Sequence, residues 1–114
     1  MLRRAVAAEL NAMLQNVVRE GTGTLAKVDG YKVAGKTGTA QKPDEHGGYS
    51  GGRYVASFIG MVPASRPRLV VLVVVDEPHG AIWGGVVAAP AFAQIAGYDL
   101  QYLEVPPDNT GNRG

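Results

Sequence analysis

The stretch GYKVAGKTGTAQKP, residues 30–43, is compatible with two different folds, and the choice between them decides the architecture. Its beginning matches GxxxxGK[ST], the pattern of a phosphate-binding loop, which follows a buried strand and opens a helix. Here a polar turn comes before the pattern, and the glycine, threonine and proline after it disfavour a helix. Tyr31, Val33 and Ala34 favour a strand. We therefore predict a strand over residues 31–41 and keep a P-loop nucleotide binder as a less favoured alternative.

The composition is that of one globular domain. The chain has 114 residues, 46% of them apolar and 18% charged, with a formal net charge of +1. Basic and acidic residues are mixed along the chain, so there is no basic patch that would indicate nucleic-acid binding. The absence of cysteine excludes disulfides, thiolate metal sites and cysteine nucleophiles. The longest apolar run, residues 69–75, is far shorter than the roughly 20 residues of a membrane-spanning helix.

An amphipathic helix is expected before this stretch, over about residues 2–19. Gly21 and Gly23 end it, because glycine tolerates the left-handed geometry common after a helix. A helix already under way at the first residues suggests a chain cut from something longer. Its apolar side recurs at helical spacing and comprises Leu2, Val6, Leu10, Met13, Leu14, Val17 and Val18.

Two further strands are expected after this stretch, over residues 53–62 and 68–76. The short turn between them makes them antiparallel neighbours. The unbroken run of valine and leucine in the second predicts that both of its faces are covered. Residues 42–52, with a proline and four glycines, are expected to form a mobile surface loop.

A second helix is expected to begin near Pro90, since proline is favoured in the first turn of a helix. Pro106 and Pro107 end it. A domain over residues 1–107 would then be followed by a disordered tail, residues 108–114. The buried side of the helix would comprise Phe92, Ile95, Ala96, Leu100 and Leu103.

The predicted fold class is α+β: an antiparallel sheet of three strands, with an N-terminal and a C-terminal helix packed on opposite faces. The strand over residues 31–41 would have an open outer edge. Three strands and two helices are few for an independent domain, so we expect part of the sheet to be missing.

The groups of a binding site lie together on the 31–41 strand, at Lys36-Thr37-Gly38-Thr39. Side chains alternate along a strand, so only an edge strand lets Lys36 and Thr37 reach one ligand. Gly38 has no Cβ and allows a ligand backbone to pair as an added strand. The threonine hydroxyls can donate to a carboxylate, the ammonium supplies positive potential, and a strand N–H can serve an oxyanion hole. These groups suit a peptide acyl donor that bears a carboxylate.

Several stretches resemble class B penicillin-binding proteins, the peptidoglycan D,D-transpeptidases. The longest, residues 17–41, contains the KTG triplet that marks penicillin-binding proteins and class A β-lactamases. The resemblance implies a fragment of the serine transpeptidase/β-lactamase-like fold, from the C-terminal part of the transpeptidase domain. The other similar stretches are FIG (58–60), VVDEP (74–78), GGVVAAPAF (84–92) and VPPDN (105–109), the last being similar to the division-specific branch.

The resemblance implies roles for individual residues. Lys36 would be catalytic through the electrostatics of the active site. Thr37 and Thr39 would bind the carboxylate of a substrate or β-lactam, and the Thr39 N–H would form half of the oxyanion hole. Trp83 would line the pocket beside the ligand, or alternatively anchor the core.

The family's nucleophile lies in an SxxK motif, and a second motif has the form SxN; this sequence contains neither. Ser50, Ser57 and Ser65 have no lysine three positions later. We therefore expect the chain to contribute one wall of the active site and to be inactive alone.

The resemblance also implies the partners and location of the parent protein. It would cross-link stem peptides ending in D-Ala-D-Ala during septal synthesis, bind β-lactams, and work at the periplasmic side of the inner membrane. The fragment itself would be soluble and would fit against the rest of the transpeptidase domain. Its open edge could also drive self-association, and a noncatalytic module that recruits a peptide or a second copy is the main alternative.

Other polar residues are not expected to carry chemistry. Asp76 and Glu77 are neighbours on a strand, so their side chains should point to opposite faces and not form an acid/base pair. His46 and His79 are isolated in loops, so we expect no metal and no cofactor.

Overall fold

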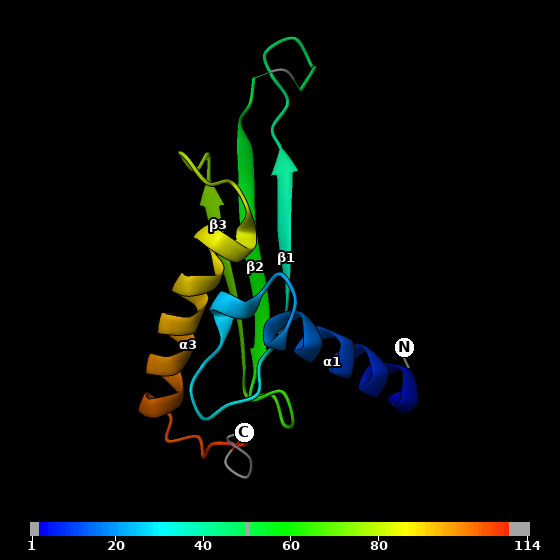
Figure 1. The fold of residues 1–114 in the computed structure, drawn as a ribbon, viewed down its shortest axis with the longest axis vertical. Helices are drawn as coiled ribbons and strands as arrows, with labels where there is room; N and C mark the ends of the chain where they lie inside the picture. The colour runs from blue at the N-terminus through cyan, green and yellow to red at the C-terminus, as the bar shows by residue number, and fades with distance from the viewer. Residues whose placement is uncertain (1–2, 50, 110–114) are drawn as a thin grey trace.

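The computed structural model describes residues 3–49 and 51–109. They form an elongated body of 52 × 32 × 26 Å around a three-stranded sheet (Figure 1). The predicted α+β class, with a helix before and a helix after three strands, is confirmed. The elements in chain order are α1 (Arg4–Arg19), the 3-10 turn η1 (Thr24–Ala26), β1 (Ala34–Gln41), β2 (Tyr54–Val62), β3 (Leu69–Asp76), α2 (Gly84–Val87) and α3 (Ala89–Tyr102).

The sheet has the order β1-β2-β3, and both pairs are antiparallel. β2 is the central strand, so β1 is an edge strand, as predicted. Thr37 of β1 lies opposite Phe58 of β2, and Phe58 lies opposite Val73 of β3. This register puts all three side chains on one face of the sheet, called here the helix face.

The core lies between the helix face and α3. The rings of Phe58 and Phe92 meet edge to face, with centroids 4.9 Å apart and planes at 60°. Gly60 makes this contact possible, because a Cβ there would come within 2.6 Å of the Phe92 ring. Val18, the buried residue of α1, belongs to the same cluster.

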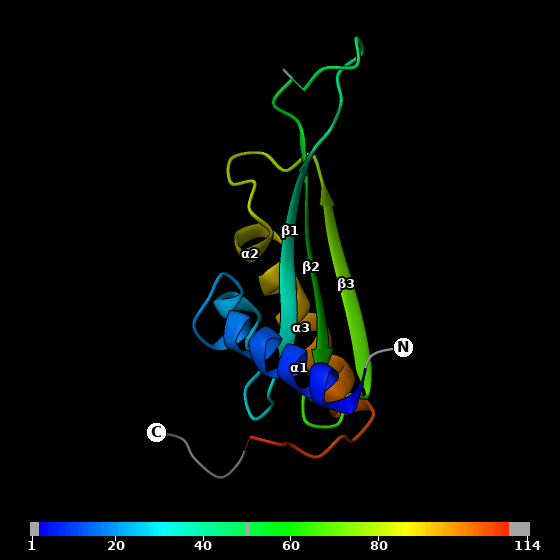
Figure 2. The ribbon, with the colours of Figure 1, turned by 90° about the vertical axis from the view of Figure 1, so that its right-hand side faces the viewer.

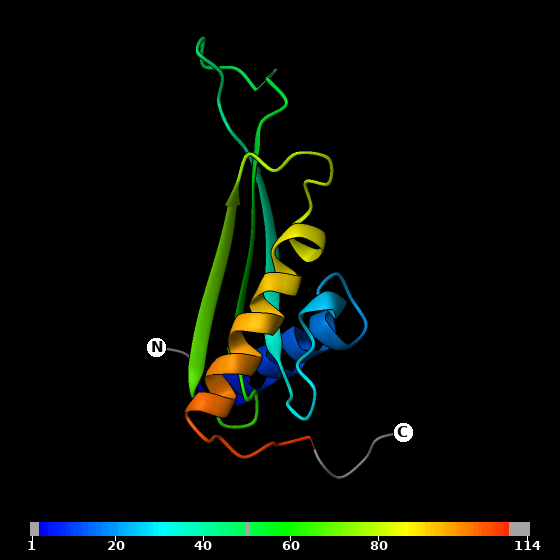
Figure 3. The ribbon, with the colours of Figure 1, turned by 90° about the vertical axis from the view of Figure 1, so that its left-hand side faces the viewer.

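The two long helices do not cover opposite faces, so that prediction was wrong. α2 and α3 lie along the helix face (Figure 3). α1 crosses the open edge of β1 near the start of that strand and brings its last turn into the same core (Figure 2). The long turn through η1 lets the chain pass from α1, at the open edge of the sheet, into β1. The sequence alone did not reveal this path.

The prediction that both faces of β3 are covered was also wrong. Burial alternates along the strand, and Val70, Leu72 and Val74 are 70%, 59% and 54% exposed. Together with Ile59 of β2, they form an apolar outer stripe on the face opposite the helices. Branched aliphatic residues favour a strand wherever it lies, so composition alone did not report how many faces are covered.

The residues after α3 are tied to the lower end of the molecule in Figure 1. The Asp108 carboxylate accepts hydrogen bonds from the Lys32 N–H at 2.7 Å and from Ser65 Oγ at 2.5 Å. The Asn109 N–H donates to the Gly30 carbonyl at 3.1 Å. Asp108 and Asn109, the first two residues of the predicted tail, therefore contact the body of the domain, and the rest of the tail lies outside the described residues. Met1 and Leu2 of the predicted first helix also lie outside them.

None of the helices in the described part of the chain is long and apolar enough to cross a membrane.

Candidate functional site

The Lys36–Thr39 motif lies in the middle of β1, which continues as a strand to Gln41. No helix opens directly after the motif, because β1 leads into the connection to β2. A phosphate-binding loop needs a compact turn that opens a helix. The P-loop alternative is therefore excluded, and the strand prediction is confirmed, although β1 begins at Ala34 rather than at Tyr31.

Side chains of the motif leave β1 on both faces, as predicted. Thr37 and Thr39 share the helix face and lie opposite Phe58 and Ala56, whereas Lys36 leaves on the other face opposite Ile59. The Lys36 side chain nevertheless turns back toward its own strand: Nζ donates to the Thr37 carbonyl at 3.0 Å and lies 3.5 Å from Thr37 Oγ1. The ammonium and a threonine hydroxyl therefore meet at this strand.

Both threonine hydroxyls lie close to residues from other elements, and the sequence pattern did not predict these contacts. Thr37 Oγ1 lies 3.4 Å from Thr22 Oγ1, in the turn after α1. The Gly84 N–H, in the first turn of α2, donates to Thr39 Oγ1 at 3.4 Å. A hydroxyl that accepts a hydrogen bond can still donate one, so Thr39 retains its proton for a ligand.

The pair Gly84-Gly85 lets α2 touch the sheet directly. A Cβ on Gly84 would collide with the Ser57 carbonyl oxygen, and one on Gly85 would collide with that of Thr22. A Cβ on Gly38, one strand away, would lie 2.7 Å from Ser57 Oγ. Only glycine permits such close approach. The glycine pair in the sequence could have indicated a close backbone contact, but not that this contact involves β1.

Trp83 is the residue just before α2 and is 62% exposed. A core anchor would be buried, so that alternative for Trp83 is excluded. The indole instead stands at the surface, next in the chain to the Gly84 N–H that contacts Thr39.

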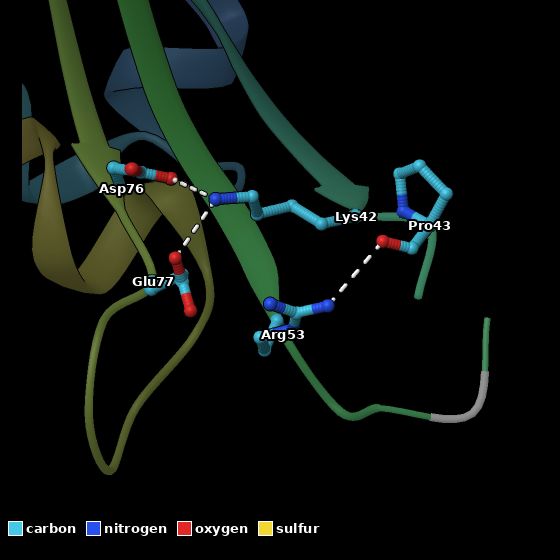
Figure 4. A network of polar contacts seen from close by, with 5 residues as sticks. All are labelled: Lys42, Pro43, Arg53, Asp76 and Glu77. Carbon is cyan, nitrogen blue, oxygen red and sulfur yellow. Dashed lines mark hydrogen bonds and ion pairs between the residues drawn. The ribbon is translucent and has the colours of Figure 1, made fainter. Parts of the chain in front are cut away.

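Asp76 and Glu77 do not point to opposite faces, contrary to the prediction. Both carboxylates pair with Lys42, at 3.1 Å and 2.8 Å from Nζ (Figure 4). Glu77 has left the strand and has a φ of 51°, which redirects its side chain. The hydrogen bond to Glu77, followed by that to Asp76, raises the pKa of the Lys42 ammonium above its ordinary 10.5.

A hollow of about 620 Å³ lies away from the motif, between α1 and residues 27–33. None of the residues from Lys36 to Thr39, nor Trp83, lines it. The motif therefore lies on an edge strand and outside this hollow. Among residues 3–49 and 51–109, no cluster of histidine and carboxylate side chains is arranged to hold a metal ion.

Comparison with known proteins matches this arrangement to one family. The model of the penicillin-binding protein transpeptidase domain matches residues 2–97. The probable peptidoglycan D,D-transpeptidase PbpC of Pseudomonas aeruginosa is 45% identical over 106 residues, which cover 91% of this chain and 19% of that protein. The peptidoglycan D,D-transpeptidase FtsI of Escherichia coli is 39% identical over 105 residues, which cover 89% of this chain and 18% of FtsI.

Solved structures agree with the sequence relatives. The transpeptidase domain of Burkholderia pseudomallei penicillin-binding protein 3 superposes with a TM-score of 0.80 at 47% identity, covering 91% of this chain and 32% of that one. Penicillin-binding protein 3 of Mycobacterium tuberculosis, solved in complex with ampicillin, gives 0.78 at 36% identity, covering 92% and 25%. The chain spans about a fifth of the length of the curated relatives it matches. It belongs to the penicillin-binding protein transpeptidase family.

Proposed function

We propose that this chain is the C-terminal segment of a serine-type peptidoglycan D,D-transpeptidase and supplies one wall of its active site. The observation that carries the proposal is the Lys36–Thr39 motif on an open edge strand, with an ammonium and two hydroxyls within reach of that edge. A peptide acyl donor can pair with such an edge through its backbone, while its carboxylate meets the hydroxyls. The substrate would be a stem peptide ending in D-Ala-D-Ala, and β-lactams would occupy the same site.

Each residue of the motif has a distinct role in this proposal. Lys36 acts through its positive charge, beside the nucleophile of the complete domain. Thr37 and Thr39 bind the substrate carboxylate, and the Thr39 N–H stabilises the oxyanion. Gly38 leaves room for the substrate backbone, and Trp83 flanks the bound ligand as an exposed aromatic wall.

The nucleophile is the part that this sequence does not supply, since no serine has a lysine three positions later. Catalysis by an oxyanion hole alone retains only a small part of the rate, and it forms no acyl enzyme. We therefore propose that the chain alone is inactive, and that activity needs the remainder of a transpeptidase domain. The parent would work in septal wall synthesis at the periplasmic side of the inner membrane, whereas the fragment itself would be soluble.

Labelled penicillin tests this proposal directly. The complete transpeptidase domain that contains this segment should form a stoichiometric acyl adduct, detected by mass spectrometry, and the 114-residue chain should form none. Thr39→Val in the complete domain should slow acylation by about 10-fold or more, because a charge-assisted hydrogen bond to the ligand is lost. A covalent adduct on the 114-residue chain would contradict the proposed division of the site.

A second, noncatalytic function has its own support in β3. This edge strand presents the apolar outer stripe, and such strands tend to pair with other chains. We propose that the isolated chain self-associates through β3. Sedimentation velocity should detect dimers or larger species at high concentration, and a monomer throughout would refute this.

A further inference from the structure

A cluster of ion pairs and a backbone hydrogen bond link the ends of all three strands on the side of the sheet toward which β1 runs (Figure 4). Lys42 directly follows β1, and its N–H donates to the Arg53 carbonyl, just before β2, at 2.8 Å. Its side chain then reaches Asp76, the last residue of β3, and Glu77 beyond it. One ammonium therefore connects both edge strands across β2.

Glu77 has an unusual backbone that makes this double contact possible. A φ of 51° is uncommon for a residue with a long side chain, and such residues persist only where their surroundings hold them. The Glu77 N–H still donates to the Tyr54 carbonyl at 2.8 Å, which extends the pairing of β2 with β3 by one residue. The chain therefore changes direction at Glu77, while the carboxylates of Asp76 and Glu77 both remain paired with the Lys42 ammonium.

The segment that begins at Glu77 leads back to the motif. It runs to Trp83 and Gly84, and the Gly84 N–H donates to Thr39 Oγ1 at 3.4 Å. Gly84 has no room to move toward the sheet, because it already touches the backbone of Ser57. The segment 77–84 is thus held at both ends, by Lys42 at one and by the sheet beside Thr39 at the other.

We propose that Lys42 is a positioning residue for the edge of β1. By holding Asp76 and Glu77, it fixes the segment 77–84, and this segment in turn supplies the N–H that orients the Thr39 hydroxyl. Accepting that N–H leaves the hydroxyl proton free to point at an incoming carboxylate. The consequence for catalysis rests on the proposed transpeptidase function, whereas the mechanical link does not.

Hydrogen exchange of this chain tests the mechanical link. Lys42→Gln should speed exchange of the Gly84 amide about twofold to fivefold, the range expected for a partly exposed ion pair, and leave α3 amides unchanged. Glu77→Asn should have a similar effect, because asparagine tolerates the left-handed backbone but lacks the charge. Lys42→Arg should restore slow exchange, and Lys27→Gln, a lysine far from the cluster, should match the wild type. Unchanged Gly84 exchange in Lys42→Gln would overturn the proposal.

Acylation of the complete domain by a labelled penicillin tests the consequence. Lys42→Gln should lower the second-order rate constant about twofold to fivefold at low salt. Because the charges are partly exposed, the wild-type rate should fall toward that of the variant at about 1 M salt, where the screening length is roughly 3 Å. A general loss of stability would not produce this convergence. Equal rates for wild type and Lys42→Gln at low salt would overturn the catalytic consequence. A wild-type domain that is not acylated at all would instead refute the proposed function, and the hydrogen-exchange result would then decide whether Lys42 is a positioning residue.

Discussion

The two edge strands of the sheet differ in nearly every residue, although both pair with β2 on one side. β1 reads AGKTGTAQ and contains no large apolar residue, whereas β3 reads LVVLVVVD and is aliphatic up to its last position. In the described part of the chain, neither strand has a partner on its outer side. An edge made of glycine, threonine and lysine resists nonspecific pairing and offers hydrogen-bonding groups to a ligand, while an aliphatic edge requires an apolar cover. The first edge is suited to binding and the second to packing.

The largest expected effect tests how tightly the β1 side is packed. Gly84→Ala should destabilise the chain by about 1–3 kcal/mol, because its Cβ would collide with the Ser57 carbonyl and the backbone must shift. Urea titration measures the free energy of unfolding. Gly97→Ala is the matched control, because its Cβ would lie 3.7 Å from Val28, which is an ordinary contact. Alanine is favoured over glycine inside a helix, so this variant should raise the free energy of unfolding by about 0.5–1 kcal/mol. If the two variants were equally stable, α2 would not be seated on the sheet as described.

A smaller effect distinguishes the two faces of β3. Val73→Thr puts a hydroxyl against the core and should cost roughly 1–2 kcal/mol, whereas Val74→Thr on the outer stripe should change the unfolding free energy of the monomer by less than about 0.5 kcal/mol. Val74→Thr should instead weaken self-association. Urea titration at low concentration and sedimentation at high concentration separate the two quantities. Equal destabilisation of the monomer would mean that the outer stripe is covered in solution.

The same contrast explains how far the sequence could predict the fold. The strands and the two long helices follow from local signals, namely the apolar period, the glycines after α1 and the proline near the start of α3. What covers a strand is not a local property, so the valines of β3 gave no indication that one face is open. For α1, the amphipathic pattern predicted an apolar buried side, but only Val18 among the described residues of that side is buried. Val6, Leu10 and Met13 are 40%, 41% and 63% exposed. The pattern also did not indicate which face of the sheet the helix joins.

The candidate site shows a similar limit. The edge position of the Lys36–Thr39 motif was predictable from its residue types, but the roles of Lys36 and Thr39 came from resemblance. The contact between Gly84 and Thr39 joins residues 45 positions apart, and no spacing rule reports it. The side of Glu77 was predicted wrongly because the alternation of side chains along a strand was applied to it. Glutamate rarely adopts the left-handed backbone that Glu77 has, so nothing in the sequence indicated it.

The smallest expected effect concerns Lys42, which joins the two contrasting edge strands. Its pKa is raised above 10.5 by Glu77 and Asp76, so its contribution to stability is fully present below pH 10.5 and is lost as pH rises through the folded-state value. The difference in unfolding free energy between wild type and Lys42→Gln should therefore be constant from neutral pH up to that point and shrink above it. Lys42→Arg should keep its advantage over Lys42→Gln in alkali, because a guanidinium stays protonated. Urea titrations across this pH range measure both differences, and a wild-type advantage that persisted unchanged in alkali would mean that the two edges are joined by packing rather than by charge.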